Sequence, residues 1–154
     1  MNLLEKFILQ RLQPTQLRIE VLRMVKDKGA QEAKVELSLT PRLVKTDSGD
    51  ELPAYQVTAR LSCRSGAKDK DEPLFKALVG FEAVYQQVSG DPVDIAEFTT
   101  NHPSLIRQLY PLLQQELRVL MNRVGLEQIH LPYDLAAQPN APENATVQVS
   151  GSVH

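Results

Sequence analysis

A helical pattern with one broad apolar face dominates residues 102–135. Apolar side chains recur there at spacings of three and four, as on one side of a helix: Leu105, Ile106, Leu109, Leu112, Leu113, Leu117, Leu120, Met121 and Val124. Asn101 or Ser104 can cap the start of this helix, and Gly125 follows its end. Pro111 lacks an N–H and crowds the preceding turn, so the pattern predicts a kinked helix followed by an extended, apolar, proline-containing segment.

Three segments before the helix alternate apolar and polar residues with a period of two, at 34–45, 55–64 and 74–88. Such alternation is typical of half-buried strands. The connecting segments are short, charged and contain Gly and Pro, which predicts antiparallel hairpins. On the middle strand, Arg60 and Arg64 face away from the apolar side.

The segment 3–25 fits two interpretations. Leu17, Ile19 and Val21 alternate with polar residues as a strand would, although a helix also fits part of the pattern. Pro14 favours an edge strand or two short pieces. We therefore predict a strand over 16–22, and we expect residues 89–101 to form a crossover turn or a short helix.

The C-terminal residues 136–154 are small and polar, with two prolines, and cannot bury enough apolar surface to offset their ordering entropy. The sequence therefore predicts one domain over 1–135 and a disordered tail over 136–154. The fold class is α+β: a four-stranded antiparallel sheet with a long kinked helix and a second short helix on one side.

The formal net charge of −2 predicts no sequence-independent attraction to nucleic acid or to an anionic membrane. The chain shows no signal-peptide pattern and no apolar run near twenty residues, so we expect a cytoplasmic protein that does not insert into membranes.

Residues for catalysis are few. His102 is favoured as a cap or surface residue over a base, and His130 as a structural residue. Cys63 has the inward parity of its strand, which favours a buried, inert thiol over a nucleophile. No phosphate-binding loop and no metal-type spacing occurs. We therefore predict a protein that is not an enzyme and that needs no cofactor.

The order of these pieces resembles the SecB family of protein-export chaperones. The resemblance runs over roughly residues 7 to 135 and is carried by FILQRLQPTQLRIEV, KVELSL, YQVTARLSC, PLFKALVGFEAVYQ and the helix from NHPSL to MNRVG, followed by IHLP. It implies a tetramer, assembled as a dimer of dimers. It also implies ATP-independent holdase activity: unfolded, export-bound polypeptides are bound and passed to the SecA motor. Members of this family also act as chaperones of toxin–antitoxin systems.

The resemblance also suggests where partners bind. An acidic sheet surface docks the motor in this family, and Asp47, Asp50 and Glu51 are the residues here that match it. Their alternative interpretation is a solvated hairpin tip.

The apolar helix face is wider than packing on a small sheet requires. Its surplus indicates either an oligomer interface or a groove for unfolded polypeptides. The candidate polypeptide-binding residues are Phe81, Phe98, Leu109, Tyr110, Leu113, Leu117, Met121 and Tyr133. The alternative function is a structural or adaptor module dedicated to one partner, for example in a toxin–antitoxin or other secretion system.

Overall fold

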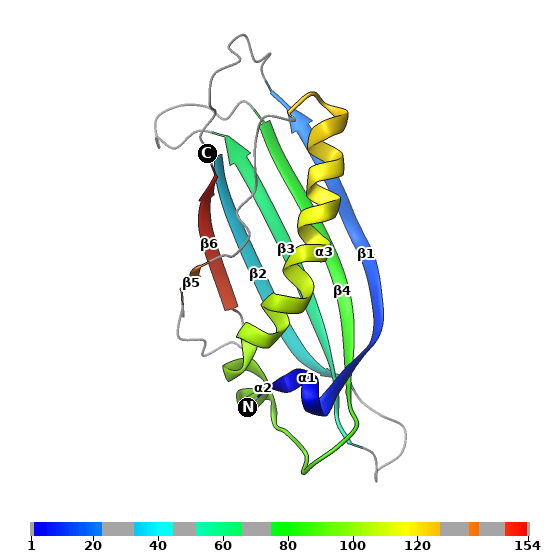
Figure 1. Cartoon of the computed structure of the whole chain (residues 1–154). Helices are drawn as coiled ribbons and strands as arrows, with labels where there is room; N and C mark the ends of the chain where they lie inside the picture. Colours follow the sequence, from blue (N-terminus) through cyan, green and yellow to red (C-terminus); the bar gives the residue numbers. More distant parts are fainter. Residues whose placement is uncertain are drawn as a thin grey trace.

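The computed structural model describes residues 2–22, 33–44, 52–65, 75–126, 136–138 and 147–153. Its strands form one antiparallel sheet in the order β1-β4-β3-β2-β6-β5. One long helix, α3, crosses a single face of this sheet (Figure 1). The elements are α1 (Leu3–Lys6), β1 (Phe7–Val21), β2 (Ala33–Val44), β3 (Ala54–Ser65), β4 (Phe75–Gln87), α2 (Ile95–Thr100), α3 (His102–Arg123), β5 (Ala136–Gln138) and β6 (Val147–Val153). The predicted α+β class and its four strands are confirmed.

Strand β1 lies at one edge of the sheet and pairs only with β4 among the described strands. It begins at Phe7, well before the predicted start. The pairing shifts register between Pro14 and Gln16, so that Thr15 is left out of the ladder. A proline is tolerated at such a position because an edge strand and a bulge both need fewer N–H donors. Opposite the bulge, a side chain at Gly80 would come within 3.3 Å of Thr15 and Gln16, so a glycine suits this close approach.

Strands β2, β3 and β4 form the two predicted antiparallel hairpins. Their odd-numbered residues point to α3 and are buried along nearly the whole of β3 and β4. Because side chains alternate between the two faces of a strand, the register places equivalent rows of residues on the same face across the sheet. The apolar core therefore lies between these rows and α3.

The tail does not follow its prediction at residues 147–153. These residues form β6, which pairs with β2 from Ala33↔Val153 to Leu39↔Val147, and β5 pairs with β6 in turn. The expectation of disorder is wrong here. Composition alone missed the period-two alternation of Val147, Val149 and Val153, which the free edge of β2 can use for pairing.

The junction between β4 and α3 contains α2, which confirms the short-helix alternative. The Asp94 side chain accepts a hydrogen bond from Glu97 N at 2.8 Å and caps this helix. Phe98 inserts beneath it, with its ring stacked on Tyr55 at 4.4 Å and edge-on to Phe7 at 5.2 Å. This aromatic cluster fixes the end of the sheet from which α3 departs.

Helix α3 begins after Asn101 and ends in a Schellman motif. Leu126 N donates to Met121 O at 2.9 Å and Gly125 N donates to Asn122 O at 3.2 Å. Gly125 has a φ of 79°, as this motif requires, so the predicted end of the helix is confirmed. Asn101 is the N-cap residue, but its side chain donates to Glu97 O of α2 instead. The helix continues through the exposed Pro111, and the kink there stays a prediction.

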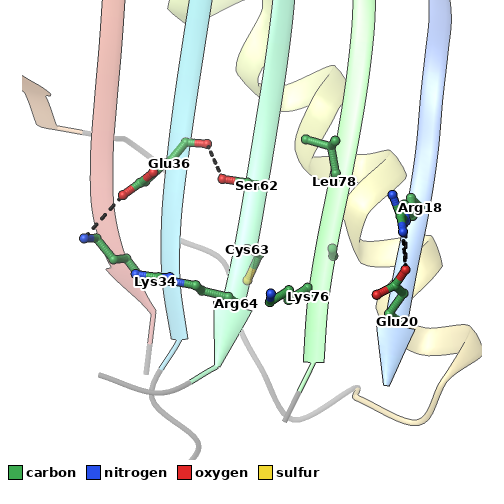
Figure 2. Close-up of a pocket in the computed structure, with 10 residues that line it drawn as sticks. Arg18, Glu20, Lys34, Glu36, Ser62, Cys63, Arg64, Lys76 and Leu78 are labelled. Atoms are coloured by element: carbon green, nitrogen blue, oxygen red, sulfur yellow. Dashed lines mark hydrogen bonds and ion pairs between the residues drawn. The ribbon is translucent and has the colours of Figure 1, made fainter. Parts of the chain in front are cut away.

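The face of the sheet opposite α3 carries polar and charged side chains. Figure 2 shows this outer face, with α3 behind the strands. Lys34, Ser62, Arg64, Lys76 and Arg18 all reach outward from four neighbouring strands. One sheet therefore presents two chemically different faces.

Candidate functional site

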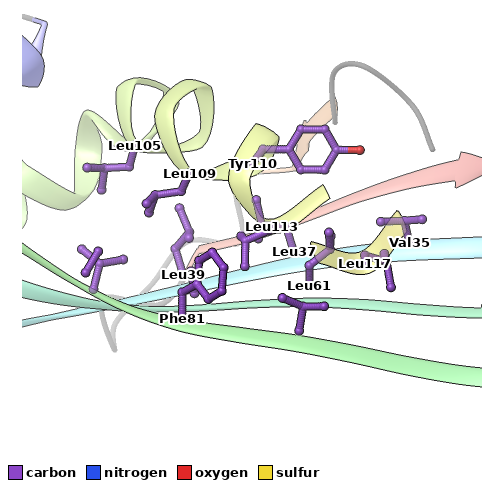
Figure 3. Packing of buried hydrophobic residues seen from close by; sticks show 14 of the residues in the cluster. Val35, Leu37, Leu39, Leu61, Phe81, Leu105, Leu109, Tyr110, Leu113 and Leu117 are labelled. Atoms are coloured by element: carbon purple, nitrogen blue, oxygen red, sulfur yellow. The ribbon is translucent and has the colours of Figure 1, made fainter. Parts of the chain in front are cut away.

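The predicted polypeptide-binding residues are mostly core residues of the chain. Seven of the eight are described, and each is at most 4% exposed: Phe81, Phe98, Leu109, Tyr110, Leu113, Leu117 and Met121. Figure 3 shows Leu105, Leu109 and Leu113 of α3 above Leu39, Leu61 and Phe81 of the sheet. The structure brings these seven into one cluster, but beneath α3 and not along an open groove. Tyr133 lies outside the described residues, as do Asp47, Asp50 and Glu51.

Tyr110 lies on a flank of α3. Its ring extends to the side of the helix in Figure 3, whereas Leu109 and Leu113 point to the sheet. The side chain is only 2% exposed. Gln114, one turn later on the helix, is also buried. A role of Tyr110 in contacting a client stays a prediction, and the structure gives it a packed position.

The opposite flank of α3 faces β1 and is much more open. Helical spacing places Leu112 and Val119, seven residues apart, on one stripe beside Leu120. Leu112 and Leu120 are half-buried and Val119 is 42% exposed. The apolar surplus predicted for this helix is therefore located on one side of it.

Strand β1 continues this apolar surface. Leu17, Ile19 and Val21 pair with Val79, Ala77 and Phe75, so their side chains share the helix-covered face. Leu17 is 48% exposed and Val21 43%, whereas their buried partners lie beneath α3. We call the surface formed by Leu17, Ile19, Val21, Leu112, Val119 and Leu120 the α3–β1 shelf.

The path of α3 explains why the shelf is uncovered. The helix crosses the sheet obliquely and its C-terminal half lies over β4, beside β1 (Figure 1). It contacts β1, β3 and β4. A single helix about 10 Å wide cannot cover an edge strand as well as the central ones. The apolar side chains of Leu17 and Val21 on β1 are therefore left exposed.

Among the described residues, the buried polar groups show no catalytic arrangement. Burial raises the pKa of the Cys63 thiol to about 12, which keeps it protonated and unreactive. Burial also raises the pKa of Tyr85, whose hydroxyl donates to Gln108 Oε1 at 2.8 Å. His102 Nδ1 lies 3.1 Å from Thr99 O, at the step between α2 and α3. These contacts describe structural roles for the three side chains.

The described ranges contain no group of three potential metal ligands among His, Cys, Asp and Glu side chains. Within the same ranges, no helix combines the length and the apolar character needed to cross a membrane.

Comparison with known proteins identifies the fold. No protein-family model and no curated protein matches the sequence. Among solved structures, the chain matches the SecB-like chaperone Rv1957 of Mycobacterium tuberculosis, in complex with a ChAD peptide from the Rv1956 HigA1 antitoxin. The TM-score is 0.66, with 17% identity, over 86% of this chain and 93% of that one. The chain has the SecB fold. This agreement confirms the resemblance drawn from the order of the sequence motifs, at the level of the fold.

The shelf was only partly visible in the sequence. The stripe with Leu112 and Leu120 was recognised as surplus apolar surface, and the alternation of Leu17, Ile19 and Val21 was recognised as a strand. Their adjacency depends on β1 pairing with β4 across more than fifty residues. Pro14 was the one local signal that this strand lies at an edge.

Proposed function

We propose that the protein is a SecB-like chaperone that binds non-native polypeptide without ATP. The observation that carries the proposal is the α3–β1 shelf, an exposed apolar surface on a SecB fold. Aliphatic side chains accept many sequences because their contacts are not directional. The adjacent edge of β1 also offers backbone groups to which an extended polypeptide can pair.

The shelf also suits contact between copies of the chain. Exposed apolar surfaces of this kind mark interfaces as well as ligand sites. We propose a homo-oligomer, a tetramer in line with the family resemblance, in which α3 or β2 lies at a two-fold contact. Light scattering at micromolar concentration tests this assembly, and a monomer there would contradict it.

A general holdase and a dedicated adaptor differ in the number of clients. The antitoxin peptide bound to Rv1957 favours the adaptor as the second candidate, with one polypeptide segment as its client. For the general holdase, we expect delivery of clients to SecA in the cytoplasm. The two functions share a binding surface and differ in selectivity.

The experiment that tests the proposal is suppression of aggregation for several unrelated, chemically unfolded proteins. A general holdase protects all of them at stoichiometric concentration without ATP. An adaptor protects none of them but binds one partner tightly. If the protein neither protects any unfolded protein nor binds an antitoxin-type peptide, the proposed function is wrong.

A further inference from the structure

Three cations lie directly opposite one another across the outer face. Lys34 of β2 pairs with Arg64 of β3, and Arg64 pairs with Lys76 of β4. Neighbouring strands lie about 4.8 Å apart, so the row spans roughly 10 Å. Like charges placed directly opposite each other destabilise a sheet. Arg64, which has a cation on each side, therefore does not serve the stability of the fold.

Glutamates lie at both ends of the row and not at its centre. Glu20 of β1 is the cross-strand partner of Lys76 in the sheet register. Lys34 Nζ lies 3.3 Å from Glu36 Oε1, and Arg18 forms an ion pair with Glu20. Among the described residues, neither Arg64 nor Lys76 has an ion-pair partner. Both side chains are exposed. Within this part of the chain, both cations are thus available to a partner.

The surface around the row is hollowed. A pocket of about 540 Å³ extends over all four strands, with Arg18 and Glu20 at the β1 side and Lys34 and Glu36 at the β2 side (Figure 2). Leu78 is half-buried and contributes apolar surface to the same pocket. The pocket therefore combines positive charge with apolar surface.

The excess of positive charge extends beyond the pocket. Among the described strand residues, the register places seven cations on the outer face against three glutamates, a net charge of +4, whereas the whole chain carries −2. The cations are Arg11, Arg18, Lys34, Arg42, Arg60, Arg64 and Lys76, and the glutamates are Glu20, Glu36 and Glu82. A charge of opposite sign to that of the chain, concentrated on one face, attracts and orients acidic partners.

We propose that the outer face binds an acidic polypeptide segment, with Arg64 and Lys76 at the centre of the contact. Carboxylates three or four residues apart on a helix lie about 5–6 Å from each other, close to the spacing of the strands. A helix that crosses the strands can therefore place one carboxylate near each cation of the row. An apolar residue of the same segment contacts Leu78.

Peptide carboxylates fit this pocket better than a nucleic acid does. None of the described residues that line the pocket is aromatic, so bases have no side chain on which to stack. Glu20 and Glu36 flank the cations and repel a continuous phosphate backbone. The same glutamates can accept hydrogen bonds from backbone N–H groups or basic side chains of a peptide.

This surface is independent of the α3–β1 shelf, because the two lie on opposite faces of the sheet. A polypeptide on the shelf and an acidic partner on the outer face can be bound at the same time. The proposal therefore gives the protein a second docking surface, whatever client the shelf accepts.

The test uses the full chain and a fluorescent peptide of eight glutamates, with an octamer of alternating Gly and Ser as the neutral probe and a single-stranded oligonucleotide as the third. The double variant Arg64→Glu, Lys76→Glu reverses the centre of the row. Its control is Arg107→Glu, Arg118→Glu, which makes the same change in net charge on exposed positions of α3. Circular dichroism and light scattering are used to check that both variants keep the fold and the oligomer size.

The proposal predicts that the glutamate peptide binds and the neutral peptide does not. It predicts that binding of the glutamate peptide weakens at least tenfold in the Arg64, Lys76 variant and less than twofold in the α3 control. Binding to the native protein should also weaken steeply as the salt concentration rises. Failure of the glutamate peptide to bind would overturn the proposal, as would equal weakening in both variants. Tighter binding of the oligonucleotide than of the peptide, lost in the Arg64, Lys76 variant, would assign the surface to nucleic acid instead. If the double variant misfolds, Arg64→Gln with Lys76→Gln replaces it and the same comparison decides.

Discussion

The two faces of the sheet are built from the same strands, but they present opposite chemistry. On β3 and β4, the residues that face α3 are almost all buried, whereas those that face outward include Arg60, Arg64 and Lys76. The helix-covered face stabilises the fold and exposes apolar surface at its margins, as along β1 beside α3. The outer face contributes little to the core and is free to carry charge. The comparison separates residues that hold the fold from residues that are available to partners.

Truncation in the core gives the largest expected effect. Leu113 is fully buried between α3 and the sheet, so Leu113→Ala is expected to lower the free energy of unfolding by roughly 2–5 kcal/mol. The matched variant Leu17→Ala removes the same atoms from a side chain that is 48% exposed, and we expect a loss of about 1 kcal/mol or less. Urea denaturation measures both. Equal losses would mean that the shelf belongs to the core of the folded assembly.

The buried thiol gives an intermediate effect with a defined pH window. The pKa of Cys63 is raised from 9.0 to about 12 by burial, so the folded protein holds this proton more tightly than the unfolded chain does. The resulting stability is present below pH 9 and is lost as the pH rises toward 12. The slope reaches about 1.4 kcal/mol per pH unit. We expect urea titrations at several pH values to show a steeper decline for the native protein than for Cys63→Ala, and identical slopes would contradict the burial of this side chain.

The outer face gives the smallest effect, and its sign is opposite. Arg64→Gln removes a positive charge that lies between Lys34 and Lys76, so we expect the free energy of unfolding to rise by a few tenths of a kcal/mol at low salt. The gain should disappear at high salt because exposed charges are screened. A clear loss of stability would show that Arg64 has a structural partner, and it would weaken the separation between the two faces.

The sequence predicted most of the sheet and the long helix because their periodicities are strong. The alternation along 55–64 and 74–88 and the end of α3 at Gly125 match the structure closely. The order of the segments also led to the SecB fold. Local patterns were sufficient wherever one face of an element is buried and the other is not.

The site was less predictable, because periodicity does not say how far one helix reaches. Leu109 and Leu112 both belong to the apolar pattern, yet one is buried and the other lies on the shelf. That difference depends on the path of α3 across the sheet. Leu17 and Val21 likewise fit a buried strand, and only the edge position of β1 exposes them. Composition also hid the basic outer face, because the acidic residues elsewhere give a net charge of −2. The pairing of β6 with β2 was also missed, because it depends on the free edge of β2 and not on the tail itself.

The most direct test of the account compares two leucines at opposite edges of the four predicted strands. Leu17 of β1 lies on the shelf and is 48% exposed, whereas Leu43 of β2 is 55% exposed and lies away from the shelf. Each is changed to Ser, and aggregation of an unfolded model protein is followed together with thermal midpoint and oligomer size. The account predicts that Leu17→Ser loses most of its protection against aggregation with the fold and assembly intact, while Leu43→Ser protects as well as the native protein. Full protection by Leu17→Ser, or equal loss in both variants, would contradict the assignment of polypeptide binding to the α3–β1 shelf.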